Sequence, residues 1–267
     1  METGGVKVKV YKLGYCKQLA KVASRSKKYQ WVKFWARSFL LDIPGLGRVL
    51  IDTGYSSHFF KETKKFPYFL YRLFTPVKLE GMRENLSDLT IDYLFITHFH
   101  PDHIGGLKDF KNTKWIFSKT AYEFVRNLKG FKALKEGFIP GLLPKKIPCG
   151  SLMIDHSQFT TFPFSKDFPA IDLFGNGQLF AFDLPGHAIG QMGVAFKQGE
   201  KWILMIADAS WSLEGLKQKA PPNFLGLLAQ NDRKKYLETF HKLHDLIGND
   251  PRIEIITTHG SEGDFHE

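Results

Sequence analysis

A dense cluster of side chains that bind metals most constrains this chain. The apolar run 91–97 predicts a buried strand. Within the next six residues come three histidines and one aspartate: His98, His100, Asp102 and His103. Imidazole nitrogens and carboxylate oxygens suit Zn²⁺, Fe²⁺ and Mn²⁺, and alternation along an extended backbone directs His98 and His100 to one side. Asp102 and His103, beyond a proline turn, are directed elsewhere, towards a second ion. We therefore expect a metal centre, the alternative being a polar turn with surface histidines.

Apolar periodicity predicts strand-rich stretches that alternate with helices. Strands are expected at 6–10, 34–43, 48–52, 91–97, 114–118, 179–184, 192–196, 201–207 and 253–257. Helices are expected at 120–128 and around the late segment in which Tyr236, Phe240, Leu243 and Ile247 share one face. Segment 137–150 holds three prolines and three glycines, which indicates a loop and a candidate flap. No linker-like stretch divides the chain, so one domain covering residues 1–267 is expected.

The histidine motif and four further positions resemble the metallo-β-lactamase superfamily. The motif His-x-His-x-Asp-His follows a strand, and Asp52 lies at the end of an earlier strand. Later strands lead to His187, Asp208 and His259 in the order that the superfamily shows. The resemblance implies an α/β fold, the four-layer αββα metallo-β-lactamase sandwich, with metals bound in loops after the strands.

The resemblance also implies a set of ligands and a cofactor. Seven residues would hold two divalent metal ions, with zinc first and iron or manganese as alternatives. His98, His100 and His187 would bind one ion, Asp102, His103 and His259 the other, and Asp208 would lie between them. Asp52 would accept hydrogen bonds that hold the histidine loop in place. The remaining histidines, which match no such position, are expected to be ordinary surface or packing residues: His58, His156, His241, His244 and His266.

Two adjacent divalent cations predict a hydrolase. They lower the pKa of a bridging water towards about 7 and so supply hydroxide, while one ion polarises the scissile group. No serine or cysteine nucleophile is then required. Asp102 and Asp208 are the candidate catalytic residues, since each could pass a proton to the leaving group.

The chain resembles single-domain quorum-quenching lactonases most within that superfamily. A lactone or related carboxylic ester is therefore the expected substrate, with a phosphodiesterase acting on nucleic acid or a small phosphodiester, or a glyoxalase II-like thioesterase, as alternatives. Many such lactonases place a tyrosine three residues after the bridging aspartate, whereas this chain has Trp211. An indole N–H donates one hydrogen bond but transfers no proton. Either another group, such as Tyr55 or a metal-bound water, replaces that hydroxyl, or the substrate differs.

An aromatic stretch at 66–74 has several open interpretations. Such residues usually pack in a core, but the stretch could also form a lid or, with Trp31, Phe34 and Trp35, an apolar groove for an acyl chain. The same residues could equally form the interface of a homodimer.

Composition bounds location and partners. The net charge of +10 favours anionic partners, yet the lysines are spread along the chain, so a merely basic surface is the simpler interpretation and nucleic acid is not favoured. No apolar run approaches the roughly 18 residues of a membrane span. Cys16 and Cys149, far apart, are expected as free thiols in a reducing compartment, which favours the cytoplasm.

Overall fold

The computed structural model describes residues 5–80, 86, 89–162 and 165–260, and the chain forms two compact units. Unit 1 comprises residues 1–17 and 33–154, and unit 2 comprises residues 18–32 and 155–267. Each unit is built on one sheet, and each is described separately below. Among the described residues no helix is both long and apolar enough to cross a membrane.

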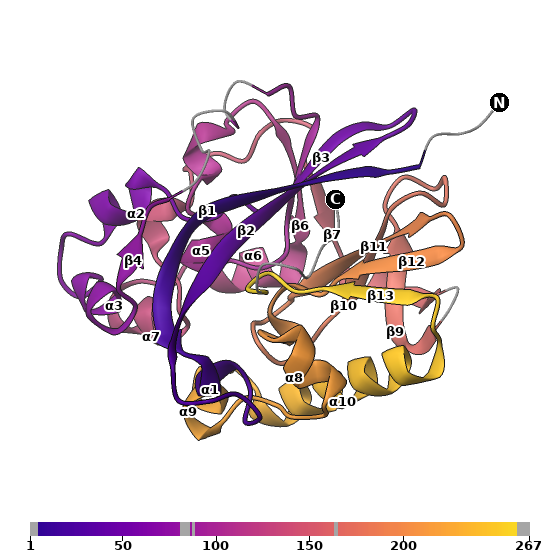
Figure 1. Cartoon of the computed structure of the whole chain (residues 1–267). Coiled ribbons are helices and arrows are strands. Elements are labelled where there is room, and N and C mark those ends of the chain that lie inside the picture. Colours follow the sequence, from indigo (N-terminus) through magenta and orange to yellow (C-terminus); the bar gives the residue numbers. More distant parts are fainter. Residues whose placement is uncertain (1–4, 81–85, 87–88, 163–164, 261–267) are drawn as a thin grey trace. The chain divides into compact units, whose positions relative to one another are not determined.

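Unit 1 contains a seven-stranded sheet with the order β4-β1-β2-β3-β5-β6-β7 (Figure 1). Its strands are β1 (Lys7–Leu19), β2 (Trp31–Ile43), β3 (Gly47–Ile51), β4 (Val77–Lys78), β5 (Tyr93–Ile96), β6 (Lys114–Ser118) and β7 (Leu152–Ile154). The ends of β1 and β2 that lie within residues 18–32 belong to unit 2. Strands β3, β5, β6 and β7 run parallel, while β4 and β3 pair antiparallel with β1 and β2, respectively.

The helices of unit 1 are short. They are α2 (Ser57–Glu62), α3 (Phe69–Phe74), α5 (Pro101–Ile104), α6 (Lys119–Val125) and α7 (Gly130–Lys135), with 3₁₀ turns at Leu107–Asp109 and Pro140–Leu142. Apart from that last turn, segment 137–150 contains no helix or strand, as the sequence predicts. The expectation that the aromatic stretch packs in the core holds only in part: no residue of α3 is fully buried, but Tyr68 and Tyr71 pack against the core cluster of unit 1.

The central strands of unit 1 explain how distant residues reach one edge of the sheet. Leu94, Phe95 and Ile96 in β5 are fully buried, as expected for a parallel strand that is covered on both faces. Ile51 pairs with Phe95 in parallel register. The residue after β3, Asp52, and the residues after β5 therefore leave the sheet at the same edge.

Unit 2 contains a six-stranded sheet with the order β13-β12-β11-β10-β9-β8 (Figure 1). Its strands are β8 (Thr160–Phe162), β9 (Ser165–Asp172), β10 (Phe180–Asp183), β11 (Met192–Gln198), β12 (Lys201–Met205) and β13 (Ile253–Ile256). Its helices are α1 (Ala20–Ala23), α8 (Leu213–Lys217), α9 (Phe224–Leu228) and α10 (Arg233–Asn249), with 3₁₀ turns at His156–Gln158 and Ala207–Ala209. Among the described residues of this unit, only β12 and β13 pair in parallel, with Met205 opposite Ile256.

Helix α10 confirms the predicted late helix and covers the core of unit 2. The Asp232 side chain caps its first turn by accepting a hydrogen bond from the backbone N–H of Lys235. Tyr236, Phe240 and Leu243, four and three residues apart, are fully buried. Phe240 and Leu243 pack in one apolar cluster with side chains of β10, β12 and β13.

Candidate metal centre

The histidine loop of unit 1 begins where β5 ends and turns into α5. Pro101 occupies the first turn of α5, and the backbone N–H groups of His103 and Ile104 both donate to the His100 carbonyl. A Cβ added to Gly105 would come within 2.5 Å of the Gly54 carbonyl oxygen. The loop can therefore pack this closely against the segment after β3 only with glycine at position 105.

Asp52 holds this loop with its carboxylate. Its Oδ1 accepts the backbone N–H of Thr97 at 2.9 Å, and its Oδ2 accepts the Thr97 hydroxyl at 2.8 Å. The same Oδ2 lies 2.6 Å from Nδ1 of His103. Asp52 has a φ of 58°, in the left-handed region that residues other than glycine rarely adopt. Backbone strain at this buried position is thus offset by three hydrogen bonds to one carboxylate.

Two imidazoles of unit 1, those of His98 and His103, are oriented through their Nδ1 atoms. Nδ1 of His98 lies 3.1 Å from the Thr97 hydroxyl, and Nδ1 of His103 bonds Asp52. The ring centroids of His98 and His103 are 3.9 Å apart, and those of His98 and His100 are 4.6 Å apart. Because Nδ1 is engaged in His98 and His103, Nε2 is the nitrogen that each can present to a metal ion. Asp102 Oδ2 lies 3.6 Å from Nε2 of His103, so carboxylate and imidazole donors stand together.

His187 occupies a tight turn that follows β10 in unit 2. Gly186 has a φ of 126°, and a Cβ there would lie 2.2 Å from the backbone nitrogen of Tyr236. The N–H groups of Asn231 and Asp232 donate to the carbonyls of His187 and Gly186. The start of α10 therefore fixes this turn, and only glycine allows so close an approach.

Gln230 orients His187. Its Oε1 lies 2.8 Å from Nδ1 of His187, and its side-chain amide donates to the Gly226 carbonyl at 2.7 Å. Gln230 is a candidate positioning residue that the sequence analysis did not predict. No local pattern marks it, since it lies 43 residues from His187 in the chain and only the fold brings them together.

The Asp208 carboxylate contacts three side chains within unit 2. Its Oδ2 accepts the indole N–H of Trp211 at 2.8 Å and lies 3.2 Å from Nε2 of His259 and 3.4 Å from Nε2 of His187. The preceding residue, Ala207, has a φ of 46°. A left-handed residue thus stands at Asp52 in unit 1 and directly before Asp208 in unit 2.

The negative charge of Asp208 also affects the buried phenol of Tyr236. Burial raises the pKa of Tyr236 well above its usual value, and the negative charge of Asp208 raises it further. Among the described residues, the Tyr236 hydroxyl has no hydrogen-bond partner. Tyr236 therefore stays neutral in the folded protein at physiological pH.

The donor chemistry of both units fits divalent transition metals. Unit 1 offers the imidazoles of His98, His100 and His103 with the carboxylate of Asp102, and unit 2 offers His187, His259 and Asp208. In each unit at least one candidate ligand histidine has its Nδ1 fixed by a neighbouring oxygen, as histidine ligands of metal sites usually do. Nitrogen and oxygen donors without cysteine suit Zn²⁺, Mn²⁺ or Fe²⁺.

The other predicted residues lie as follows. The Tyr55 ring is buried in the apolar core of unit 1 and meets Phe59 edge-on, with centroids 5.2 Å apart. His58 pairs with Asp109 at 2.7 Å, and His156 with Asp183 at 3.1 Å. The imidazole of His244 lies against the Leu216 carbonyl on α8. These three histidines serve local packing, as the sequence predicts.

A family model and many relatives match this chain. The model described as the metallo-beta-lactamase superfamily matches residues 36–246. The N-acyl homoserine lactonase AttM of Rhizobium radiobacter is 26% identical over 225 residues, which are 80% of this chain and 81% of AttM. The probable metallo-hydrolase Rv2300c of Mycobacterium tuberculosis is 25% identical over 242 residues, 80% of this chain and 71% of that protein.

Solved structures show the same fold. An AiiA variant of B. thuringiensis with N-decanoyl-L-homoserine bound at its active site has a TM-score of 0.69 at 18% identity, covering 97% of this chain and 95% of AiiA. AidC, a dizinc quorum-quenching lactonase in complex with a product, has a TM-score of 0.61 at 14% identity, covering 99% of this chain and 89% of AidC. The predicted metallo-β-lactamase fold is confirmed.

Proposed function

The chain belongs to the metallo-beta-lactamase superfamily and is a metal-dependent hydrolase, and on this premise we propose that it opens a lactone or cleaves a related carboxylic ester. The observation that carries the proposal is the similarity to AttM lactonases over 80% of the chain. The held imidazoles of His98, His103 and His187 support it, since a hydrolytic metal centre needs oriented ligands.

The proposed centre is dinuclear and uses the seven ligands that the family resemblance implies. On that resemblance, His98, His100 and His187 would hold one ion, Asp102, His103 and His259 would hold the other, and Asp208 would complete the set. When bound, two such ions supply a water of lowered pKa and polarise the substrate carbonyl. We propose zinc, for which the dizinc lactonase AidC is a precedent within the fold.

The chain's own residues then orient the ligands and move a proton. Asp52 and Thr97 fix the histidine loop, and Gln230 fixes His187. Asp102 and Asp208 are the proposed carriers of the proton that reaches the leaving oxygen. Trp211 donates its N–H to Asp208 and so orients that carboxylate.

We assign the substrate contact to Trp211 rather than Tyr55. Trp211 is a direct neighbour of Asp208, and its ring meets the His187 ring edge-on with centroids 5.7 Å apart. Tyr55 packs in the core of unit 1 with 2% of its surface exposed, so its hydroxyl is the poorer candidate.

Location and assembly follow as further proposals. The chain has two cysteines, Cys16 and Cys149, far apart in sequence, and on this composition we propose the cytoplasm as the working compartment. The family match extends across both units, which supports one domain made of the two. A homodimer remains a prediction that size-exclusion chromatography with light scattering would decide.

A phosphodiesterase is the second candidate. The net charge of +10 and the exposed Lys145 and Lys146 in the segment 137–150 favour an anionic substrate. A glyoxalase II-like thioesterase is the third, and one assay separates all of them.

The deciding experiment compares three substrates on one metal-replete preparation. These are an N-acyl homoserine lactone, bis-p-nitrophenyl phosphate and a glutathione thioester, with metal content measured on the same sample. We expect lactone turnover that disappears in a His100→Ala variant and is retained in a matched His58→Ala variant. Turnover of the phosphodiester alone, or of the thioester alone, would replace the lactonase proposal.

A further inference from the structure

Two short segments of unit 1 expose large apolar side chains on one surface. Phe66 and Leu73 are each 65% exposed, Phe74 is 78% exposed, and Phe131 on α7 is 59% exposed. The rings of Phe66 and Phe131 meet edge-on with centroids 5.3 Å apart, so the two segments form one continuous surface. We call residues 61–78 and 126–136 the apolar-basic surface.

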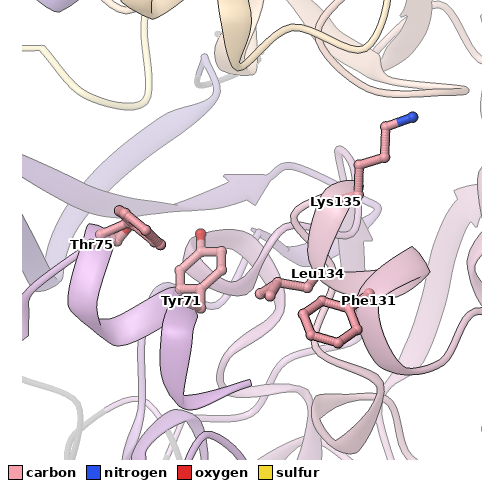
Figure 2. Close-up of a pocket in the computed structure, with 6 residues that line it drawn as sticks. Tyr71, Thr75, Phe131, Leu134 and Lys135 are labelled. Atoms are coloured by element: carbon pink, nitrogen blue, oxygen red, sulfur yellow. The ribbon is translucent and has the colours of Figure 1, made fainter. Parts of the chain in front are cut away.

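A pocket opens between α3 and α7 on this surface. It has a volume of about 520 Å³ and is lined by Tyr71, Phe74, Thr75, Phe131, Leu134 and Lys135. In Figure 2 the side chains of Tyr71, Leu134 and Phe131 gather around the opening, while Lys135 extends away from them. The arrangement places apolar groups at the centre and a cation at the rim.

The two segments that carry these apolar side chains are rich in exposed cations. The two segments carry nine lysines and arginines against two glutamates, a net charge of +7. All nine are exposed: Lys61, Lys64, Lys65, Arg72, Lys78, Arg126, Lys129, Lys132 and Lys135. One of the two glutamates, Glu62, is neutralised by Lys108 at 2.6 Å. Most of the positive excess of the whole chain therefore lies on this surface.

We propose that the apolar-basic surface docks on a bilayer that contains anionic phospholipid. Exposed phenylalanine and leucine side chains enter the boundary between headgroups and acyl chains, and flanking lysines bind the anionic headgroups. The inner leaflet of cell membranes carries such anionic lipid. This inference is independent of which ester the enzyme cleaves.

Charge and side-chain chemistry favour a bilayer over other occupants. A second copy of the chain would bring one surface of charge +7 against another, which is repulsive. A nucleic acid would satisfy the cations, but four projecting apolar side chains on adjacent short segments fit a fluid apolar layer better than a phosphate backbone.

The test is flotation of the whole protein with lipid vesicles. The vesicles are pure phosphatidylcholine, or phosphatidylcholine with about 30 mol% phosphatidylglycerol. We expect binding to the anionic vesicles that weakens with added salt, and little binding to the neutral ones. The double variants Phe66→Ser/Phe74→Ser and Lys64→Glu/Lys65→Glu should each weaken binding about tenfold or more, by loss of apolar burial and of charge respectively.

A matched control comes from unit 2. Phe224 and Leu225 on α9 are 68% and 59% exposed but lie outside the apolar-basic surface, so Phe224→Ser/Leu225→Ser should bind vesicles as the wild type does. All replaced side chains are exposed, and circular dichroism checks that each variant folds. The proposal is overturned by absence of binding to anionic vesicles, by unchanged binding of Phe66→Ser/Phe74→Ser, by a wild-type dimer that this variant dissociates, or by tighter binding of a single-stranded oligonucleotide.

Discussion

The two units hold their candidate metal-ligand histidines by different means. In unit 1 a buried carboxylate, Asp52, binds His103 and Thr97 together, whereas in unit 2 a neutral amide, Gln230, binds His187. A carboxylate strengthens the hydrogen bond from an imidazole N–H more than an amide oxygen does. Removing Asp52 from unit 1 should therefore lower metal affinity and the free energy of unfolding more than removing Gln230 from unit 2. The following predictions test that difference.

The largest effect is expected from Asp208→Ala. The substitution removes the carboxylate that His187, His259 and Trp211 share in unit 2, so hydrolysis should fall by about a thousandfold or more together with metal content. Turnover and bound metal are measured on the same sample, with the exposed Asp245→Ala as control. Full metal content together with full activity would remove Asp208 from the mechanism.

Asp52→Ala should have the next largest effect. Three hydrogen bonds to one buried carboxylate are lost, so the free energy of unfolding should drop by about 3 kcal/mol. Metal affinity should fall by about 10- to 100-fold, because His103 loses its orienting partner. Urea unfolding and metal titration measure the two effects, and Asp42→Ala, whose side chain is half exposed, is the matched control. Wild-type metal affinity in Asp52→Ala would show that the loop holds its shape without this carboxylate.

Gln230→Leu should have a smaller effect of the same kind. We expect a loss of about 1–2 kcal/mol in the free energy of unfolding, since two neutral hydrogen bonds are removed, and a metal affinity about tenfold weaker. The control is Gln218→Leu, which removes an exposed hydrogen bond to Glu214. The comparison between units fails if Gln230→Leu weakens metal binding more than Asp52→Ala does.

Tyr236→Phe should have the smallest effect at neutral pH. Among the described residues its hydroxyl has no hydrogen-bond partner, so removing it should leave stability unchanged or raise it by up to about 1 kcal/mol. Activity should be retained, which separates this buried phenol from the ligands of unit 2.

At alkaline pH, Tyr236 should make the free energy of unfolding depend on pH. Its raised pKa keeps the phenol neutral in the folded protein, while the unfolded chain deprotonates near the ordinary value of 10.0. Stability is therefore fully present below that pH and falls above it, by up to about 1.4 kcal/mol per pH unit. Unfolding curves between pH 9 and 11 should show this loss in the wild type and in Tyr29→Phe, which alters an exposed tyrosine, but not in Tyr236→Phe. Equal pH dependence in all three proteins would contradict the assignment.

The sequence predicted the elements whose patterns are local. Strands β2, β3, β5, β6, β11 and β12 and helix α10 follow their apolar periodicity closely, because each segment buries one face or both. The short strands β7 and β8 and the helices α7, α8 and α9 were not predicted, since so few residues carry no clear period. The longer strand β9 was not predicted either, because its charged residues and Pro169 obscure an apolar pattern. The aromatic stretch at 66–74 suggested a core, yet Phe66, Leu73 and Phe74 are exposed while Tyr71 packs against the core, because hydrophobicity alone does not say whether a side chain finds a partner.

By itself the sequence determined the superfamily, the candidate ligands and the position of Asp52, because a metal centre demands particular side chains at particular spacings after strands. Only the tertiary structure decided which atoms orient those ligands. Gln230, the contact of Trp211 with Asp208 and the approach of α10 to Gly186 depend on residues that are distant in sequence or on backbone geometry. The exposure of Phe66 and Phe74 among lysines was likewise decided by packing, since it depends on which neighbours cover each side chain.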